Sequence, residues 1–237
     1  MQRIPVLMYH NISINVNESL GLTLFVEKLE EQLKYIVKRN YTTYFASDLE
    51  DVRRLRGKAL LVTFDDVTKN QLLYAVPLLE KYKIKATFFV PFSFVGKYDT
   101  WNDGKQEIMS IDDLKSLNRD LIQLAHHSFY HRKFDEISRG SADDDLSKSF
   151  TFISENKLKV YSAMALPYGK YPKVSWKTYD FVDVLEKYNF KMAFRIGNRV
   201  NIFPFRNKFL IKRIDIKGED SLLKFKFKIL FGKLSLF

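Results

Sequence analysis

The chain has 237 residues, of which 46% are hydrophobic; this is enough for a sizeable core and excludes intrinsic disorder. It contains no cysteine, which excludes disulfides, thiolate nucleophiles and cysteine-ligated metal sites, so any metal must be held by histidines and carboxylates. The formal net charge is +11, and residues 201–237 hold nine basic and three acidic residues, a local +6. Such a surface attracts nucleic acid, phospholipid headgroups and acidic polysaccharides alike, so charge alone does not identify a partner.

The first residues run directly into a strand-like segment, without the apolar stretch and small-residue cleavage site of a signal peptide. The longest apolar stretch, residues 86–95, is about half a membrane span and is interrupted by Pro91 and Ser93. From the sequence as given we therefore expect no transmembrane helix and a cytoplasmic or peripheral membrane protein.

Helix-type and strand-type patterns of hydrophobic residues alternate from one end of the chain to the other. Apolar residues at three- and four-residue spacing predict helices, and short continuous apolar runs predict strands buried on both faces. In chain order the expected elements are a strand at 4–8, a helix at 25–37, strands at 41–45 and 59–64, a helix at 72–82, a strand at 86–90, a helix at 110–117, a strand at 121–125, a helix at 143–155, a strand at 160–166, a helix at 178–188, and strands at 191–196 and 209–216.

This alternation has no linker-like break, so we predict a single α/β domain over residues 1–237 with a parallel sheet. We favour a closed (β/α) barrel over an open doubly wound sheet. In a barrel the loops that follow the carboxyl ends of the strands converge on one mouth, and catalytic residues are expected there.

Two carboxylates, Asp65 and Asp66, directly follow the predicted strand at 59–64. Adjacent side chains of a continuing strand point to opposite faces, so both can serve one site only where the strand ends and the backbone turns. The mouth of the barrel provides such a turn. The alternative is a solvated loop in which Asp66 caps the following helix.

Three of the four histidines, His126, His127 and His131, lie within six residues just after the predicted strand at 121–125. His127 and His131 are four residues apart, so in a helical turn they would share one face at a separation suited to one metal ion. We interpret these two as metal ligands and His126 as a packed neighbour. The alternative is a pair of imidazoles without a metal.

These motifs resemble the polysaccharide deacetylases with the NodB homology domain, carbohydrate esterase family four. Residues 63–66 (Thr-Phe-Asp-Asp) match the first family motif, 127–131 (His-Ser-x-x-His) the second and 167–169 (Pro-Tyr-Gly) the third, in the family's order and spacing. Residues 5–10 and 213–216 look like the branch that opens with a Tyr-His pair and includes deacetylases of exported N-acetylglucosamine polymers. The resemblance implies a distorted (β/α) barrel that removes acetyl groups from N-acetylated sugars.

Carried over residue by residue, the resemblance implies that one divalent metal ion is bound by Asp66, His127 and His131. Zinc suits two neutral imidazoles and one carboxylate in the absence of thiolates. By the same resemblance Asp65 is the base that activates the attacking water. The backbone N–H of Tyr168 would bind the tetrahedral oxyanion, with Pro167 fixing its approach.

Three departures from the family pattern bear on the chemistry. Val67 stands where a Gly usually follows the Asp pair, so the loop needs an ordinary backbone conformation or bears strain. Ala165 replaces an Arg that in many members orients the base, which predicts the loss of that partner. No histidine follows His131, so the family's late His, the acid that protonates the leaving amine, has no counterpart.

His10 is our candidate for this general acid. It follows the predicted strand at 4–8, so in a barrel it should reach the same mouth as Asp65, and an imidazole titrates in the range needed to protonate an amine. The alternative is a buried structural histidine whose ring is bonded to the backbone.

Residues 223–229 alternate strictly between apolar and basic side chains. As a strand this segment would have one basic and one apolar face, whereas a helix would mix them. We therefore expect a basic alternating tail at about 217–237. It would form a solvated edge strand or contact an anionic membrane that carries a lipid-linked glycan.

The sequence thus predicts a metal-dependent polysaccharide N-deacetylase with an N-acetylated glycan as substrate. Two alternatives stay open: a hydrolase that uses the same centre on a non-glycan amide, and a non-catalytic glycan-binding relative or pseudo-enzyme. No nucleic-acid partner is expected, because the chain lacks a recognised nucleic-acid motif and such a module has no need of an Asp pair with His-x-x-x-His.

Overall fold

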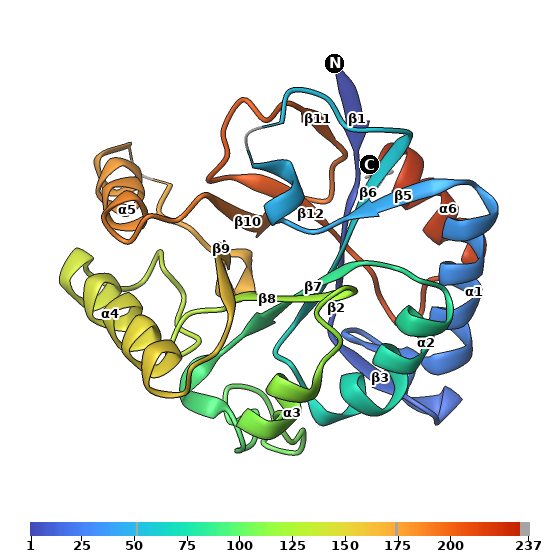
Figure 1. Cartoon of the computed structure of the whole chain (residues 1–237), viewed down its shortest axis with the longest axis horizontal. Coiled ribbons are helices and arrows are strands. Elements are labelled where there is room, and N and C mark those ends of the chain that lie inside the picture. The colour runs from blue at the N-terminus through green and yellow to red at the C-terminus, as the bar shows by residue number, and fades with distance from the viewer. Residues whose placement is uncertain (51, 174, 233–237) are drawn as a thin grey trace.

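A computed structural model describes residues 1–50, 52–173 and 175–232 of the chain (Figure 1). Its helices are α1 (Val26–Lys38), α2 (Val76–Lys81), α3 (Ile111–Ser116), α4 (Arg139–Glu155), α5 (Ser175–Lys187) and α6 (Leu222–Phe231). Its strands are β1 (Gln2–Ile4), β2 (Val6–Tyr9), β3 (Asn11–Ser13), β4 (Thr23–Phe25), β5 (Tyr41–Tyr44), β6 (Lys58–Asp65), β7 (Ala86–Val90), β8 (Ile122–His126), β9 (Val160–Ala165), β10 (Met192–Ile196), β11 (Asn201–Phe203) and β12 (Ile211–Asp215).

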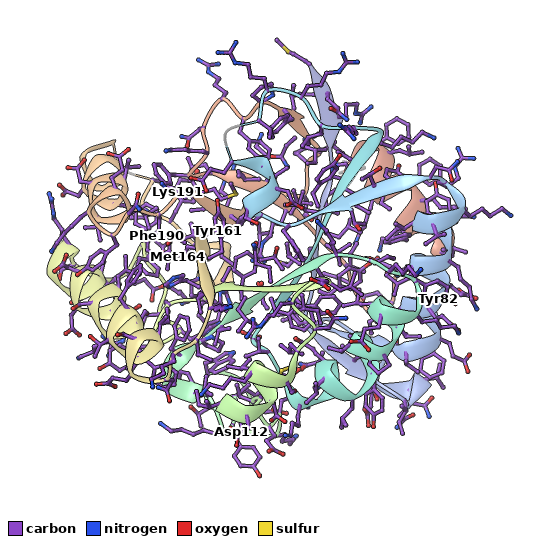
Figure 2. The ribbon with its side chains drawn as sticks, in the orientation of Figure 1. Tyr82, Asp112, Tyr161, Met164, Phe190 and Lys191 are labelled. Carbon is purple, nitrogen blue, oxygen red and sulfur yellow. The ribbon has the colours of Figure 1, made fainter. Side chains whose placement is uncertain are left out.

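Seven strands form a closed parallel barrel in the order β2-β12-β10-β9-β8-β7-β6, and the pairing of β2 with β6 closes it. The helices surround this barrel (Figure 1), and side chains fill the space between the elements (Figure 2). Strand β5 pairs with the first half of β6, and β1 forms a short antiparallel ribbon with β11. The predicted single α/β domain with a distorted (β/α) barrel is therefore confirmed.

Alternate residues of β6 enter different parts of the core, as the two-residue period of a strand requires. Leu61 belongs to a cluster with Phe89 and Phe194, whose rings lie 5.6 Å apart. Leu60 and Phe64 belong instead to the cluster that packs against the outer helices. Asp65 has the same parity as Leu61, so the end of the strand directs its carboxylate into the barrel.

Most of the predicted elements are confirmed to within a few residues, and two differ for local reasons. The helix expected at 72–82 consists of a π-helical segment (Gln71–Ala75) followed by α2, with Pro77 in the first turn of α2. Proline has no N–H and cannot continue the preceding hydrogen-bond pattern. Helix α4 begins at Arg139 rather than near 143, because Ser138 caps it by accepting from the N–H of Ser141.

The alternating segment at 223–229 is part of helix α6, so the expected edge strand is wrong. Phe225 and Ile229, four residues apart, are both buried against the core, and buried Lys228 bonds to the carboxylate of Asp220. The side chain of Ser221 caps the helix at the N–H of Lys224. The alternation of Lys and Phe hides this three- and four-residue spacing. No helix among the described residues is long and apolar enough to cross a membrane.

A pair of substitutions distinguishes the helix from the strand. In a strand Phe225 and Phe227 would face the same way, whereas in α6 Phe225 is 0% exposed and Phe227 is 46% exposed. We expect Phe225→Ala to lower the free energy of unfolding by about 3 to 5 kcal/mol and Phe227→Ala to change it by less than about 0.5 kcal/mol. Urea unfolding measures both, and equal losses would contradict the helical assignment.

Candidate active site

The turn that follows β6 directs both carboxylates of the Asp pair into one cavity. Asp66 and Val67 adopt left-handed backbone conformations, with φ of 75° and 46°. This is where the strand ends, and Asp65 and Asp66 are 2% and 8% exposed. A β-branched residue is strained at positive φ. The backbone strain expected from having Val67 in place of the usual glycine is therefore present. The side chain of Val67 is fully buried, and its packing in the core compensates for part of that strain.

The two candidate ligand histidines lie in an irregular loop after β8, so the expected helical turn is wrong. Ser128 and His131 have positive φ, and the N–H of His131 donates to Ser128 Oγ at 2.8 Å. The buried carboxylate of Asp145 on α4 accepts from the N–H groups of Phe129 and Tyr130 at 2.7 and 3.0 Å. These bonds fold the loop back on itself and bring the two imidazoles together.

Asp66, His127 and His131 fit a single divalent cation. The two imidazole Nε2 atoms lie 3.2 Å apart, and Asp66 Oδ1 lies 3.5 Å from that of His127 and 3.4 Å from that of His131. Ligand atoms held tetrahedrally at 2.0–2.2 Å from one ion are about 3.3 to 3.6 Å apart. Asp66 Oδ1 is buried and has no hydrogen-bond partner among the described residues, as a ligand atom awaiting a metal requires.

The protonation state of His127 suits metal binding. Its Nδ1 lies 2.8 Å from the carbonyl oxygen of Ala165, so Nδ1–H donates there and the lone pair of Nε2 faces the cluster. Burial lowers the pKa of His127 to about 4, which keeps the ring neutral at physiological pH. Burial would raise the pKa of Asp66, but its interactions with His131 and His127 outweigh this and lower it.

Arg213 on β12 is the partner of Asp65. Its two terminal nitrogens donate to the two carboxylate oxygens of Asp65 at 2.5 and 2.6 Å, a bidentate pair in which both residues are buried. Burial alone would raise the pKa of Asp65, but Arg213, followed by His127 and His10, lowers it well below its usual range. The expectation that Ala165 leaves the base without a partner is therefore wrong, because a different strand supplies the guanidinium.

His10 reaches the same cavity from the end of β2. Its Nε2 lies 3.7 Å from Asp65 Oδ2, and its Nδ1 is buried without a hydrogen-bond partner among the described residues. The fully buried amide of Gln71 donates to the backbone carbonyls of His10 and Asp65 at 3.0 and 2.6 Å. Gln71 thus fixes the ends of β2 and β6 relative to each other. The backbone-bonded structural ring considered above has no support in these contacts.

These side chains line a cavity of about 460 Å³ that is flanked by two aromatic rings. The Trp101 ring stacks on the imidazole of His131 with centroids 4.3 Å apart, and the Tyr168 ring lies 4.9 Å from it at a steep angle. The site residues that line it are His10, Asp65, Asp66, Trp101, His127, His131, Tyr168, Arg213 and Asp215. Sequence analysis missed Trp101 and Gln71, which lie in no recognised motif, and it placed Arg213 in a branch motif without assigning it a role.

The Pro-Tyr-Gly segment forms a tight turn at the edge of this cavity. Pro167 is buried, and Tyr168 is 43% exposed with a φ of 56°. The N–H of Gly169 donates to Leu166 O and that of Lys170 to Pro167 O, so these bonds close the turn without the N–H of Tyr168. Gly169 has positive φ, and a Cβ there would lie 2.5 Å from the side chain of Ile196.

His126 points away from the ligand cluster and packs among aromatic rings. Its ring centroid lies 5.3, 4.9 and 4.7 Å from those of Phe92, Phe150 and Phe190. Burial lowers its pKa to about 3, so it stays neutral. It is the packed neighbour that the sequence predicted.

Comparison with known proteins identifies the family. The sequence profile described as polysaccharide deacetylase matches residues 53–184, more than half of the chain. The chain belongs to the polysaccharide deacetylase family. The matched region contains the Asp pair, the two candidate ligand histidines and the Pro-Tyr-Gly turn.

Relatives of this chain include a Staphylococcus aureus poly-beta-1,6-N-acetyl-D-glucosamine N-deacetylase, 26% identical over 173 residues that cover 68% of this chain and 56% of the relative. The chain therefore spans little more than half the length of that protein. Among solved structures it resembles Streptococcus pyogenes deacetylase PplD in complex with acetate, with a TM-score of 0.80, 19% identity and coverage of 96% and 98%. It also resembles IcaB from Ammonifex degensii, with a TM-score of 0.76, 20% identity and 95% coverage of both chains.

Removal of the Arg213 guanidinium should destabilise the protein, because the buried carboxylate of Asp65 loses its cation. In Arg213→Met the carboxylate is buried without a cation, so we expect the free energy of unfolding at pH 7 to fall by about 3 to 5 kcal/mol. The pKa of Asp65 is lowered in the native protein, so its stabilisation is present above the unfolded value and lost as the pH falls. In the Arg213→Met variant the cation is gone, so burial raises the pKa of Asp65 instead.

The difference between the two proteins should therefore shrink as the pH falls through the raised pKa of Asp65 in the variant, where the buried carboxylate takes up a proton, and should go on shrinking towards the lowered pKa of the native protein. Urea unfolding between neutral and acidic pH measures this. The control is Arg199→Met, which removes an exposed guanidinium of the same charge. A difference that does not change with pH would mean that the loss comes from packing rather than from the charge of Asp65.

Proposed function

We propose that this deacetylase is a metal-dependent enzyme that removes acetyl groups from N-acetylated sugars of a polysaccharide. The observation that carries the proposal is the convergence of three metal-ligand atoms beside an ionised, arginine-held carboxylate in an open cavity. The name of the Staphylococcus aureus relative supports a poly-N-acetylglucosamine as the substrate class. The Tyr-His pair at the end of β2 supports membership of the branch that includes such enzymes.

In this proposal Asp66, His127 and His131 hold one divalent ion, and the donor set of two imidazoles and one carboxylate favours zinc. A bound ion of this kind would polarise the acetyl carbonyl and lower the pKa of the attacking water.

Asp65 accepts the proton of the attacking water. Its lowered pKa keeps it ionised at neutral pH, and the bidentate pair with Arg213 fixes its orientation. The N–H of Tyr168, which the turn leaves free of its own bonds, donates to the oxygen of the tetrahedral intermediate. The rings of Trp101 and Tyr168 offer apolar faces on which a sugar can pack.

The leaving amine needs a proton, and His10 is the donor in this proposal. It lines the cavity, and its separation of 3.7 Å from Asp65 lets both side chains face the same substrate amide. If His10 does not serve, Asp65 can return to the amine the proton that it took from the water.

The non-catalytic alternative loses part of its basis. It depended on three departures from the family pattern: Val67, Ala165 and the missing late histidine. The turn forms with Val67 in it, and both carboxylates of the Asp pair still line the cavity. Arg213 supplies the cationic partner of Asp65 that is lost at Ala165. A hydrolase acting on a non-glycan amide would use the same residues. The two functions therefore differ only in the substrate, and activity on glycan and non-glycan amides distinguishes them.

Acetate release from N-acetylglucosamine oligomers, together with metal analysis of the purified protein, tests the proposal. We expect His127→Ala and Asp66→Asn to lose both metal and acetate release. Asp65→Asn should keep the metal and lose about 10² to 10⁴ in turnover, because only the base is removed. Unchanged acetate release by the Asp65 variant would remove that residue from the mechanism, and metal retention by the His127 variant would refute the ligand set.

The general acid can be tested with two leaving groups. We expect His10→Ala to keep the metal and to lose turnover on the glycan amide, but to lose far less on an activated acetyl ester, whose leaving group needs no proton. Parallel measurement of kcat/KM on both substrates gives the answer. Equal losses on both would leave Asp65 as acid as well as base.

A further inference from the structure

The amino ends of the barrel strands carry a strongly basic surface, at the end of the molecule opposite to the catalytic cavity. The N-terminus, β1 and β11 lie at one end in Figure 1, whereas β3 and α3 lie at the other. We define the basal surface by the exposed cations that lie just before or at the start of β2, β5 and β6, namely Arg3, Arg39, Arg53, Arg54, Arg56 and Lys58. None of them forms an ion pair with a carboxylate in the part of the chain that the structure describes.

Large apolar side chains are exposed beside these cations. Phe227, Leu230 and Phe231 of α6 are 46%, 43% and 50% exposed, and Ile202 of β11 is 45% exposed. Arg3 contacts both α6 and β11. Its side chain donates to Leu230 O, and its guanidinium lies 6.0 Å from the centre of the Phe231 ring. In the ribbon of β1 and β11, Arg3 is paired with Ile202. The apolar groups and the cations therefore form one continuous surface.

Helix α6 is apolar on two sides. Phe225 and Ile229 point inward and are buried, while the exposed residues Phe227, Leu230 and Phe231 form a stripe on the outer side. At 100° per residue, Lys224 and Lys226 fall on either side of this stripe, and of the two Lys224 also pairs with Asp220 at 2.9 Å. An apolar stripe between lysines is the arrangement of helices that lie in the interface of a membrane, where the apolar side chains enter the acyl region and the ammonium groups stay among the headgroups.

The cations also line two hollows. One of about 320 Å³ is lined by Arg3, Arg39 and Lys58 together with Leu230, and one of about 620 Å³ by Arg53 and Arg54. Guanidinium groups without a carboxylate partner bind phosphate oxygens readily. Each hollow therefore offers unpaired cations to an anionic headgroup close to exposed apolar side chains.

We propose that the basal surface binds peripherally to an anionic lipid bilayer. Both components of the surface contribute in such a contact: the cations meet the headgroup phosphates, and Phe227, Leu230, Phe231 and Ile202 enter the boundary of the acyl chains. A polyanion such as nucleic acid would use the cations but would leave the aliphatic and aromatic side chains exposed to water. Charge complementarity together with the apolar stripe therefore favours a bilayer.

The proposal sets the orientation of the bound protein. The cavity opens at the carboxyl ends of the strands, so basal binding turns it away from the lipid and towards the surrounding solution. The sequence left open a basic strand that contacts an anionic membrane carrying a lipid-linked glycan. In the orientation proposed here the cavity meets a polymer at a distance from the bilayer.

Sedimentation with vesicles tests the proposal on the full chain. We expect binding to vesicles of phosphatidylglycerol and phosphatidylcholine, little binding to phosphatidylcholine alone, and loss of binding as salt is raised. The double variant Arg53→Glu/Arg54→Glu should weaken binding by at least about tenfold, because each basic residue near an anionic surface contributes severalfold. Phe227→Ser/Phe231→Ser should weaken it by a similar factor, because two rings no longer enter the acyl boundary.

Matched controls use exposed residues far from the basal surface. Lys97→Glu/Lys115→Glu makes the same change in net charge, and Ile14→Ser/Leu73→Ser removes two exposed aliphatic side chains. Both should bind vesicles like the unaltered chain, and all four double variants should keep the cavity's acetate release in solution. That activity also shows that each variant is folded and separates this proposal from the proposed function.

Several results would overturn the proposal. Equal weakening by the control variants would mean that only overall charge matters, and equal binding to neutral vesicles would remove the role of the cations. Full binding by the Phe227/Phe231 variant would indicate attraction to any polyanion. Self-association that the same variant abolishes, without vesicle binding by the unaltered chain, would assign the stripe to a second copy of the protein.

Discussion

The site depends on the buried bidentate pair between Arg213 and Asp65. A carboxylate that is 2% exposed at the end of a strand would take up a proton unless a cation compensated for the lost hydration. Arg213 provides that charge and binds both oxygens, and one of its nitrogens also lies 3.3 Å from Thr63 Oγ1. Asp65 is thereby kept ionised and held in one orientation beside the three candidate metal-ligand atoms. The pair exists because the barrel is closed: β12 lies next to β2, β2 pairs with β6, and the two residues meet across the interior.

The backbone of the loops around this pair is strained. Among the described residues other than glycine, ten have positive φ, and five of these lie in the three loops that form the site: Asp66, Val67, Ser128, His131 and Tyr168. Left-handed backbone in such residues costs free energy, and it persists only where the surroundings hold it. Here they do: Val67 packs in the core, Ser128 bonds to His131, and Asp145 holds the histidine loop. The sharp turns let short loops present side chains that a regular helix or strand would direct elsewhere.

How much the sequence could predict follows from the range of the interactions involved. Periodicity and strand ends are local, so the barrel and the placement of Asp65, Asp66, His127 and His131 at one mouth could be predicted. The partner of Asp65 could not, because Arg213 is 148 residues away and no spacing rule connects them. The histidine loop was misjudged because a four-residue separation fits a helical turn as well as a left-handed loop. Helix α6 was misjudged because the strict alternation of Lys and apolar residues conceals the spacing of Phe225 and Ile229.

The barrel separates two kinds of charge. The Asp pair and the histidines lie at the carboxyl ends of the strands, in a cavity where Arg213 compensates the charge of Asp65 and where Asp66, His127 and His131 could hold a metal ion. The six unpaired cations of the basal surface lie at the amino ends, which β1, β11 and the last turn of α6 complete. Cations at that end lie a strand length from Asp65 and are exposed, so solvent and salt screen them from it. The excess of positive charge therefore adds little to the ionisation of Asp65, which depends mainly on Arg213, and the amino ends can bind an anionic surface without altering the chemistry at the other end.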